Sequence, residues 1–153
     1  MQSLPDKLKL STKSPLSLGE VPEDYNKLLN ESFENFERQE VARARQVDQL
    51  FAFVHEPSDV TALSTNLKGK LHGDPIIWIS YPKKSSKKNK GTLTRDLGWD
   101  AFAPLELEPV SQLSLDDDYS ILRFRRVDQI KKITRNPKMA ITNETKKRTS
   151  YQK

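Results

Sequence analysis

Two short and almost entirely apolar runs dominate the pattern of this chain. Residues 47–54 are rich in β-branched and aromatic side chains and end at His55-Glu56-Pro57, and residues 75–80 end at Tyr81-Pro82. Runs of this length and composition are typical of strands that are buried on both faces of a sheet. We therefore expect two buried strands over 47–54 and 75–80.

The spacing of apolar residues predicts two helices. The first begins at Ser58, which can cap it, and ends before Gly73-Asp74-Pro75. The second covers 94–105. In both, apolar residues recur every three or four positions and so share one helix face: Val60, Leu63, Leu67 and Leu71 in the first, and Leu97, Ala101, Phe102 and Leu105 in the second.

The beginning of the chain gives weaker signals. Residues 15–21 alternate as a first strand, although Pro15 limits this strand to a sheet edge or to a start at that residue. Pro22 and the two acids that follow it favour a short helix from there to Asn30.

The segment 33–46 is ambiguous. Its composition favours a helix around 41–45, whereas Phe33 and Phe36 suit a short strand. Both alternatives stay open at the level of sequence.

The end of the chain predicts a hairpin. Residues 109–115 and 119–127 have strand character, and the turn Asp116-Asp117-Asp118 between them is short enough to make them antiparallel neighbours. A short helix is expected over 128–135, and 136–153 forms a basic C-terminal extension.

This order of elements predicts an α/β fold. Crossover helices between buried strands imply a Rossmann-like three-layer sandwich, with a mainly parallel sheet and a C-terminal antiparallel hairpin at its edge. We expect one domain over 14–135, preceded by a polar leader over 1–13. In such sheets, ligands bind beyond the carboxyl ends of the strands.

The composition narrows the functional classes. The absence of cysteine excludes disulfides, thiolate catalysis and zinc–cysteine sites. The sequence has no signal-peptide pattern and no apolar run of membrane-spanning length, so we expect a cytoplasmic protein without a membrane partner. Charged residues make up 31% of the chain, and they are unevenly distributed.

Two basic regions stand against an acidic remainder. Residues 123–153 contain eleven Lys and Arg against two acids, and residues 83–95 contain six Lys and Arg and no acid. Because the whole chain has a net charge of only +5, the rest of it is acidic. Such segregation suggests an anionic partner, such as a small anion or nucleic acid; a solvated loop and tail is the plainer alternative.

The end of the 75–80 strand is the candidate site. There the chain leaves a buried strand, passes through a basic, Ser-rich loop and enters the predicted 94–105 helix, whose N-terminus would attract an anion. The candidate anion ligands are Tyr81, Lys83, Lys84, Ser85, Ser86, Arg95, Trp99 and Arg123. Trp99 has the alternative of a core residue, and Arg123 that of a charged residue on an edge strand.

Other sites are not supported by motifs. The chain has neither G-x-G-x-x-G nor G-x-x-x-x-G-K-[ST], so a tightly bound dinucleotide or P-loop nucleotide is not expected. Asp116-Asp117-Asp118 suits a polar turn better than a magnesium site. His55 and His72 have no acid or nucleophile motif beside them. We predict no catalytic residue, no metal and no cofactor.

Four motifs resemble those of an uncharacterised bacterial family of small α/β proteins, a domain of unknown function. The resemblance covers about 47–148 and implies a Rossmann-like sandwich with no assigned activity. Tyr119 departs from it, because such sequences commonly have Trp there, and so does the poor first strand. The motifs are Tyr81-Pro82-Lys83-Lys84-Ser85-Ser86-Lys87, Arg95-Asp96-x-Gly98-Trp99, Pro109-Val110 and Ser120-x-Leu122-Arg123-Phe124-Arg125.

Three functions follow as hypotheses. The leading one is a non-catalytic or regulatory module that binds an anionic or phosphorylated ligand at the end of the 75–80 strand. The second is nucleic-acid binding through the basic loop and tail, with phosphate contacts and steep salt dependence. The third is a degenerate methyltransferase-like or nucleotide-dependent transferase, which the sandwich with a closing hairpin would suit. A protein partner also stays open.

Overall fold

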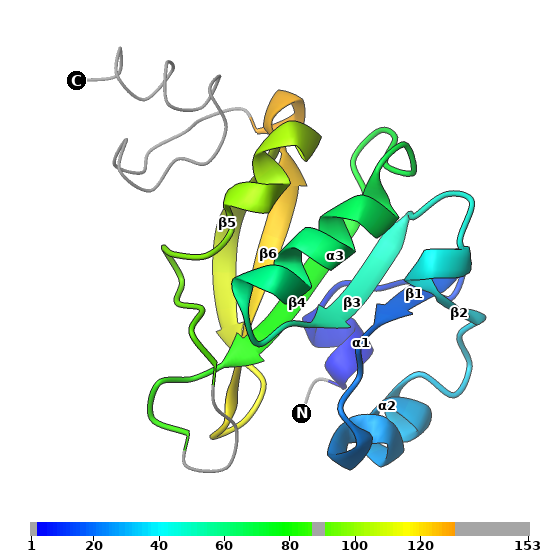
Figure 1. The fold of residues 1–153 in the computed structure, drawn as a ribbon. Helices are drawn as coiled ribbons and strands as arrows, with labels where there is room; N and C mark the ends of the chain where they lie inside the picture. Colours follow the sequence, from blue (N-terminus) through cyan, green and yellow to red (C-terminus); the bar gives the residue numbers. More distant parts are fainter. Residues whose placement is uncertain (1–2, 87–90, 131–153) are drawn as a thin grey trace.

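The computed structural model describes residues 3–86 and 91–130, and the fold is a sandwich built on one six-stranded sheet (Figure 1). The strand order is β2-β1-β3-β4-β6-β5. Strands β2, β1, β3 and β4 pair in parallel, whereas β6 is antiparallel to β4 and to β5. The strands are β1 (Leu16–Gly19), β2 (Arg38–Glu40), β3 (Gln49–Phe53), β4 (Ile76–Pro82), β5 (Leu107–Ser114) and β6 (Tyr119–Arg126).

Helices cover both faces of this sheet, so the predicted Rossmann-like three-layer α/β sandwich is confirmed. Helix α3 crosses one face together with η3, and the short helices α1 and α2 lie against the other (Figure 1). The helical segments are α1 (Leu4–Lys7), η1 (Glu23–Tyr25), α2 (Asn26–Ser32), η2 (Val41–Arg43), α3 (Pro57–Leu67), η3 (Asp100–Leu105) and η4 (Val127–Gln129).

Alternation along β3 divides its side chains between two cores. Leu50 and Ala52 join the core under α3, while Phe51 and Phe53 join the core under α1 and α2. All residues of β3 are buried, as the apolar run 47–54 predicted. A strand of this kind is buried on both faces because crossover helices cover both.

Helix α3 begins at a capping box. The Glu56 side chain accepts the backbone N–H of Asp59, and the Asp59 carboxylate accepts that of Glu56. This satisfies N–H groups that a helix start leaves without partners. The helix ends at Leu67, earlier than the apolar spacing predicted, and Gly69 follows with a left-handed φ of 77°.

The segment expected to be a polar leader is part of the second core from Ser3 onward. Leu8 is fully buried and Leu10 is nearly so. The Leu8 carbonyl accepts a hydrogen bond of 2.8 Å from the Trp78 indole N–H. The segment predicted as a polar leader over 1–13 therefore contributes two buried leucines to the second core.

The helix predicted over 94–105 is wrong in its first half. Residues up to Trp99 form a loop, and only Asp100–Leu105 is helical, as the 3₁₀ segment η3. Gly98 has a φ of 100°, and the Trp99 indole donates a 2.7 Å hydrogen bond back to the Thr94 carbonyl. These contacts close a turn that a continuous helix cannot make.

Strand pairing shows the structure of the ambiguous segment 33–46 and of the predicted hairpin. Strand β2 forms at 38–40, beside β1, while Phe33 packs fully buried in the second core. The predicted hairpin is confirmed, but β6 lies inside the sheet between β4 and β5, so only β5 is an edge strand. Of the helix predicted over 128–135, Asp128 and Gln129 belong to η4 and Ile130 is extended. Residues 131–135, like the basic extension 136–153, lie outside the described residues.

Within 3–86 and 91–130, no helix is long and apolar enough to cross a membrane.

Candidate functional site at the ends of β1 and β2

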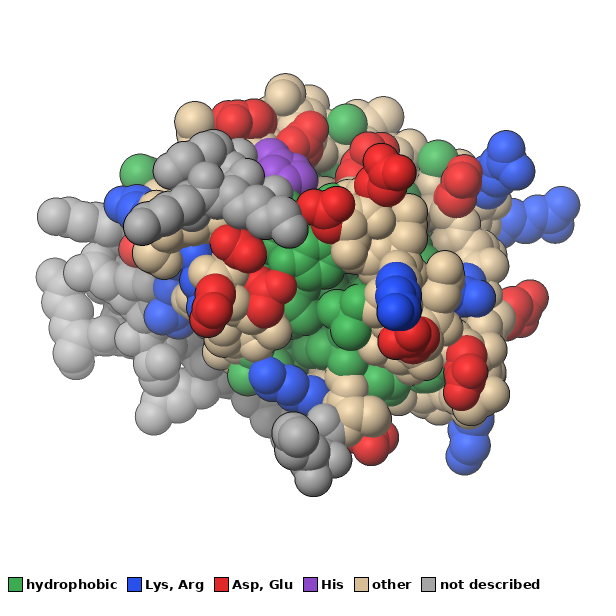
Figure 2. All heavy atoms as spheres, turned by 90° about the horizontal axis from the view of Figure 1, so that it is seen from below, with side chains coloured by type: hydrophobic (Ala, Val, Ile, Leu, Met, Phe, Trp, Pro, Cys, Tyr) green, Lys and Arg blue, Asp and Glu red, His purple; other side chains and the backbone are tan. Residues whose placement is uncertain are grey.

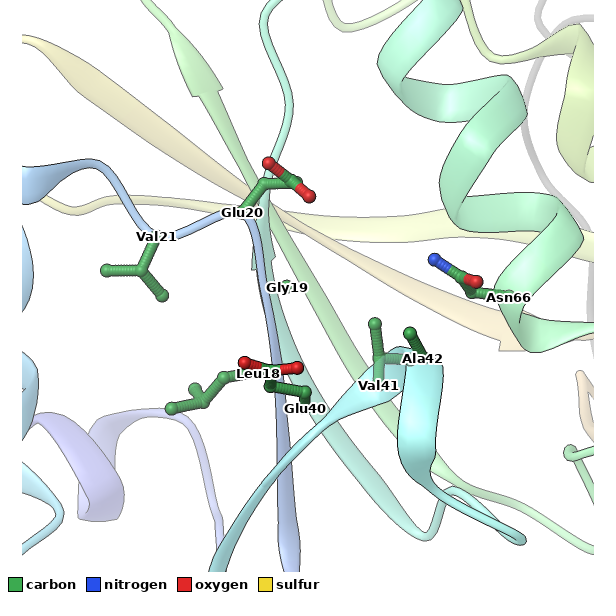
Figure 3. Close-up of a pocket in the computed structure, with 8 residues that line it drawn as sticks. All are labelled: Leu18, Gly19, Glu20, Val21, Glu40, Val41, Ala42 and Asn66. Atoms are coloured by element: carbon green, nitrogen blue, oxygen red, sulfur yellow. The ribbon is translucent and has the colours of Figure 1, made fainter.

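The sheet changes direction at β1. From β1 the chain passes to β2 on one side, and β3 then pairs with β1 on the other side. Where neighbouring parallel connections diverge in this way, the carboxyl ends of the strands leave an opening that α/β proteins use for ligands. A hollow of about 430 Å³ lies there (Figure 3), lined by Leu18, Gly19, Glu20, Val21, Glu40, Val41, Ala42 and Asn66.

A glycine forms the centre of this opening. A Cβ on Gly19 would lie 3.1 Å from the Ala52 Cβ and 3.4 Å from a methyl of Val41, so the backbone of β1 approaches β3 and η2 closely. Glu20 follows with a left-handed φ of 48°, which turns the chain away at the end of the strand. These features bring the Glu20 carboxylate to one rim of the hollow and leave its middle apolar.

The opening is acidic at its rim. Glu20 and Glu40 are exposed carboxylates from the ends of β1 and β2. Figure 2 views the edge toward which the β4 arrow points in Figure 1, and Asp and Glu side chains surround a central hydrophobic area there. Glu40 forms an exposed ion pair with Arg43 at 3.6 Å, so part of the negative charge at the rim is balanced. Carboxylates at such a rim favour a cationic or hydrogen-bond-donating ligand group.

A second hollow of about 200 Å³ continues toward α3. It shares Gly19, Glu20, Val41 and Asn66 with the first and extends along Ala52, Phe53, Val54, Asp59, Ala62 and Leu63. Asp59 is committed to the protein, since its carboxylate accepts the backbone N–H groups of His55 at 2.8 Å and Glu56 at 3.0 Å. The two hollows together offer an apolar wall with carboxylates at one end.

A network of titratable side chains lies on the same edge of the sheet. The His55 Nε2 and the Tyr119 hydroxyl are 2.7 Å apart, and the Tyr25 hydroxyl donates to the Asp116 carboxylate at 2.5 Å. Tyr119 is fully buried and packs edge-on against Tyr25 and Phe53. The network thus joins β3, η1 and the β5–β6 turn.

Burial and nearby acids keep both tyrosines protonated. Burial is the main cause that raises the pKa of Tyr119 to about 12, and Asp116, Asp118 and Asp24 add to it. Burial also raises the pKa of Tyr25 well above its usual range, together with the hydrogen bond to Asp116. Burial is the main cause of both shifts, and the nearby Asp carboxylates raise the two pKa values further.

The structure brings five of the eight predicted anion ligands together at the end of β4. Tyr81, Lys83, Lys84, Ser85 and Arg95 line a shallow hollow of about 380 Å³. Lys83, however, is held by the protein, since its ammonium group donates to the Ser114 hydroxyl at 2.7 Å.

Three other predicted ligands lie elsewhere or are committed. Ser86 is buried and donates to the Asp118 carboxylate at 2.8 Å. Trp99 is a core residue that packs on Tyr81 and Phe124, so its alternative assignment is correct.

Arg123 lies on the opposite face of the sheet from the β4 corner. Its guanidinium carbon stands 5.9 Å from the centre of the Trp78 ring. Burial, followed by the Arg125 charge, lowers the pKa of Arg123. It belongs to an inner strand, so the role of a charged residue on an edge strand does not describe it. The role of anion ligand stays a prediction.

The residues of the β1–β2 opening were missed at the level of sequence. The available signal was the acid at the end of the second strand. Glu40 stands 21 residues beyond Gly19, and in dinucleotide-binding folds an acid about 20 residues after the first turn binds ribose hydroxyls. The missing glycine motif hid this spacing, because the loop after β1 is Glu20-Val21-Pro22.

Metal ligation finds no support in the part of the chain that the structure describes, where no group of three or more His, Asp or Glu side chains is arranged to hold an ion. The Asp116-Asp117-Asp118 segment forms the turn that the plainer alternative predicted.

No protein-family model matches this chain, and no curated protein matches it. Solved structures are similar at low identity. They include the ribosomal protein L11 methylase from Lactobacillus delbrueckii subsp. bulgaricus, with 12% identity, a TM-score of 0.43, and coverage of 74% of this chain and 59% of that one. A putative type 11 methyltransferase from Sulfolobus solfataricus has 10% identity, a TM-score of 0.47, and coverage of 80% and 78%.

A third similar structure is PigF with SAH, with 11% identity, a TM-score of 0.48, and coverage of 81% of this chain and 46% of that one. This chain therefore spans less than two thirds of PigF and of the L11 methylase. At such identities the likeness concerns the fold alone.

The prediction of a non-catalytic, anion-binding module is corrected by these findings. The similar structures are named as a methylase, a putative methyltransferase and a protein solved with SAH, and none of the three is named as an anion-binding module. The described edge also differs from the prediction, since carboxylates border the opening at the ends of β1 and β2.

Proposed function

We propose that this chain is a methyltransferase-like transferase that binds S-adenosylmethionine in the opening at the ends of β1 and β2. The observation that carries the proposal is Glu40, which ends β2 and borders a ligand-sized hollow above Gly19. A carboxylate in this position suits the two ribose hydroxyls of an adenosyl group, because it accepts both hydrogen bonds.

The charge of the opening distinguishes between ligands that contain adenosine. NAD and ATP carry phosphates, which need glycine-rich backbone N–H groups or basic side chains. Here Glu20 stands directly after Gly19, where a pyrophosphate would approach the strand. S-adenosylmethionine has no phosphate and carries a sulfonium, an ammonium and a single carboxylate group, and a protein carboxylate stabilises the two cationic groups.

In this proposal, each residue of the opening contacts a different part of S-adenosylmethionine. Glu40 accepts the ribose hydroxyls, Glu20 stabilises the cationic end, and the apolar wall of Val41 and Leu63 contacts the base. When bound, S-adenosylmethionine would supply an electrophilic methyl group, with the neutral thioether S-adenosylhomocysteine as the leaving group. The protein contributes alignment of the two reactants, which accounts for a large share of such rate enhancements.

Thermal unfolding with added ligands tests this function. S-adenosylhomocysteine at about 100 times its dissociation constant adds about 2.7 kcal/mol to the free energy of unfolding. Glu40→Gln weakens binding about tenfold or more, since hydrogen bonds to a charged group contribute about 1.5–3 kcal/mol.

The matched control is Glu34→Gln, which removes an exposed carboxylate outside the hollow and leaves binding unchanged. Stabilisation by ATP or NADH but not by S-adenosyl ligands would overturn the proposal. An unchanged affinity of the Glu40→Gln variant would remove the observation on which it rests.

The nucleic-acid hypothesis depends on the loop 83–90 and the tail 123–153, of which 87–90 and 131–153 lie outside the described residues. It stays a prediction, as do the resemblance to an uncharacterised bacterial family, a cytoplasmic location and a protein partner. Short RNA and DNA in the same unfolding experiment test it, because stabilisation through phosphate contacts falls steeply with salt.

A further inference from the structure

We infer that Asn66 recognises the amino edge of the adenine base, an inference that rests on the proposed function. Asn66 is the polar side chain that α3 contributes to both hollows at the ends of β1 and β2. It lies across the opening from Glu40, so a ligand whose ribose contacts Glu40 places its base toward α3 (Figure 3).

Three hydroxyl side chains of α3 form hydrogen bonds within the protein. Ser64 donates to the Ala101 carbonyl at 2.8 Å, and Thr61 and Thr65 each donate to a carbonyl one turn earlier in α3 at 3.1 Å. The half-buried Asn66 amide has no hydrogen bond to another described residue. It therefore has no evident structural function in the described part of the fold.

The surroundings make this amide a selective group. Its neighbours Val41, Ala62 and Leu63 are apolar, so a ligand that displaces water from the hollow must replace the hydrogen bonds that the amide then loses. The group combines one acceptor oxygen with an NH₂ donor. Adenine offers the complementary pair, an exocyclic amino donor beside a ring-nitrogen acceptor, which asparagine binds with two hydrogen bonds.

This pairing predicts discrimination by the exocyclic amino group. Purine riboside is adenosine without that group, so it retains the ribose for Glu40 but loses one hydrogen bond to Asn66. We expect the wild-type chain to bind adenosine about tenfold more tightly than purine riboside, the size of one good base contact.

Calorimetric titration of the full chain with S-adenosylhomocysteine, adenosine and purine riboside provides the test. Asn66→Ala and the similarly sized Asn66→Leu are expected to lose the preference for adenosine and to bind S-adenosylhomocysteine about tenfold more weakly. Asn35→Ala, an exposed position outside the hollows, is the matched control and keeps both values. Thermal unfolding of each variant verifies that it is folded.

The outcomes separate this inference from the function on which it rests. Loss of the adenosine preference in both Asn66 variants, with the control unchanged, supports it. Retention of the preference in either folded variant overturns the role of Asn66 and leaves the proposed function standing. Absence of any binding of S-adenosylhomocysteine to the wild-type chain overturns both.

Discussion

At the scale of single residues, Asp116 connects the β5–β6 turn to the aromatic network. Its carboxylate accepts the Tyr25 hydroxyl at 2.5 Å and the backbone N–H groups of Asp118 and Tyr119 at 2.8 and 2.9 Å. Burial alone would raise the pKa of Asp116, but these hydrogen bonds outweigh it and the pKa is lowered. Folding therefore favours the ionised form of the Asp116 carboxyl group.

Asp116→Asn is expected to reduce the acid sensitivity of the fold. A carboxyl group with a lowered folded-state pKa contributes stability above its unfolded pKa, here 3.8, and that stability is lost as the pH falls through the folded pKa. Denaturant unfolding at a series of pH values from about 6 to 2 measures this. Wild type loses more stability than the variant over that range.

Asp117→Asn in the same turn is the matched control for this prediction and behaves like wild type. Equal acid sensitivity of wild type and Asp116→Asn would contradict the role assigned to the carboxylate.

The role of a residue could be predicted from sequence where it depends only on the strand or helix that contains the residue. Trp78 follows from its place inside an apolar run, and its burial is confirmed. Its indole partner, the Leu8 carbonyl, lies 70 residues away in sequence, so no local pattern could reveal it. Glu40 and Asn66 belong to separate elements that meet only because the sheet changes direction at β1.

At the scale of elements, the loop before η3 depends on Gly98. This glycine has a φ of 100°, and an added Cβ would lie 2.2 Å from the Leu93 side chain, which is itself buried. Gly69 also has a positive φ, of 77°, but an added Cβ there meets nothing within 4 Å. An alanine at Gly69 would therefore meet backbone strain alone, whereas an alanine at Gly98 would meet backbone strain and steric overlap.

Gly98→Ala should cost more stability than Gly69→Ala. Left-handed backbone alone costs an alanine about 1–2 kcal/mol, and overpacking against Leu93 adds about 1–3 kcal/mol at Gly98. Denaturant unfolding of both variants gives the difference. Equal costs at the two sites would mean that the loop relaxes without strain.

The N-terminal segment should prove to be structural. Leu8→Ala removes a fully buried side chain from the core against Trp78, and we expect a loss of about 2–5 kcal/mol in the free energy of unfolding. Leu28 is 38% exposed, and Leu28→Ala should cost less than about 1 kcal/mol. A negligible effect of Leu8→Ala would restore the interpretation of this segment as a loose leader.

The elements could be predicted where their own side chains carry the signal. Strands β3 and β4 follow from long apolar runs, and they are confirmed within a few residues. Strand β2 has the sequence Arg-Gln-Glu, which carries no apolar signal, and it exists because its backbone pairs with β1. The hairpin pattern predicts that β5 and β6 pair with each other. It does not say which of the two strands pairs with β4, and in the structure that strand is β6.

At the scale of the whole molecule, charge is segregated as the sequence indicated, but the ligand-sized opening lies on the acidic side. Glu20 and Glu40 border the hollow, whereas the basic region 123–153 begins within β6 and lies outside the described residues from 131 onward. A ligand for this edge must therefore be neutral or cationic where it meets the carboxylates. In the proposed site, Glu20 therefore favours the sulfonium and ammonium groups of S-adenosylmethionine over a phosphate at the end of β1.

The most direct test of the account is a calorimetric titration of the full chain with S-adenosylmethionine, with ATP and NADH titrated under the same conditions. The account predicts saturable binding of S-adenosylmethionine at one site per chain, and no binding of ATP or NADH at the same concentrations. Binding of ATP or NADH in preference, or no binding of S-adenosylmethionine, would contradict it.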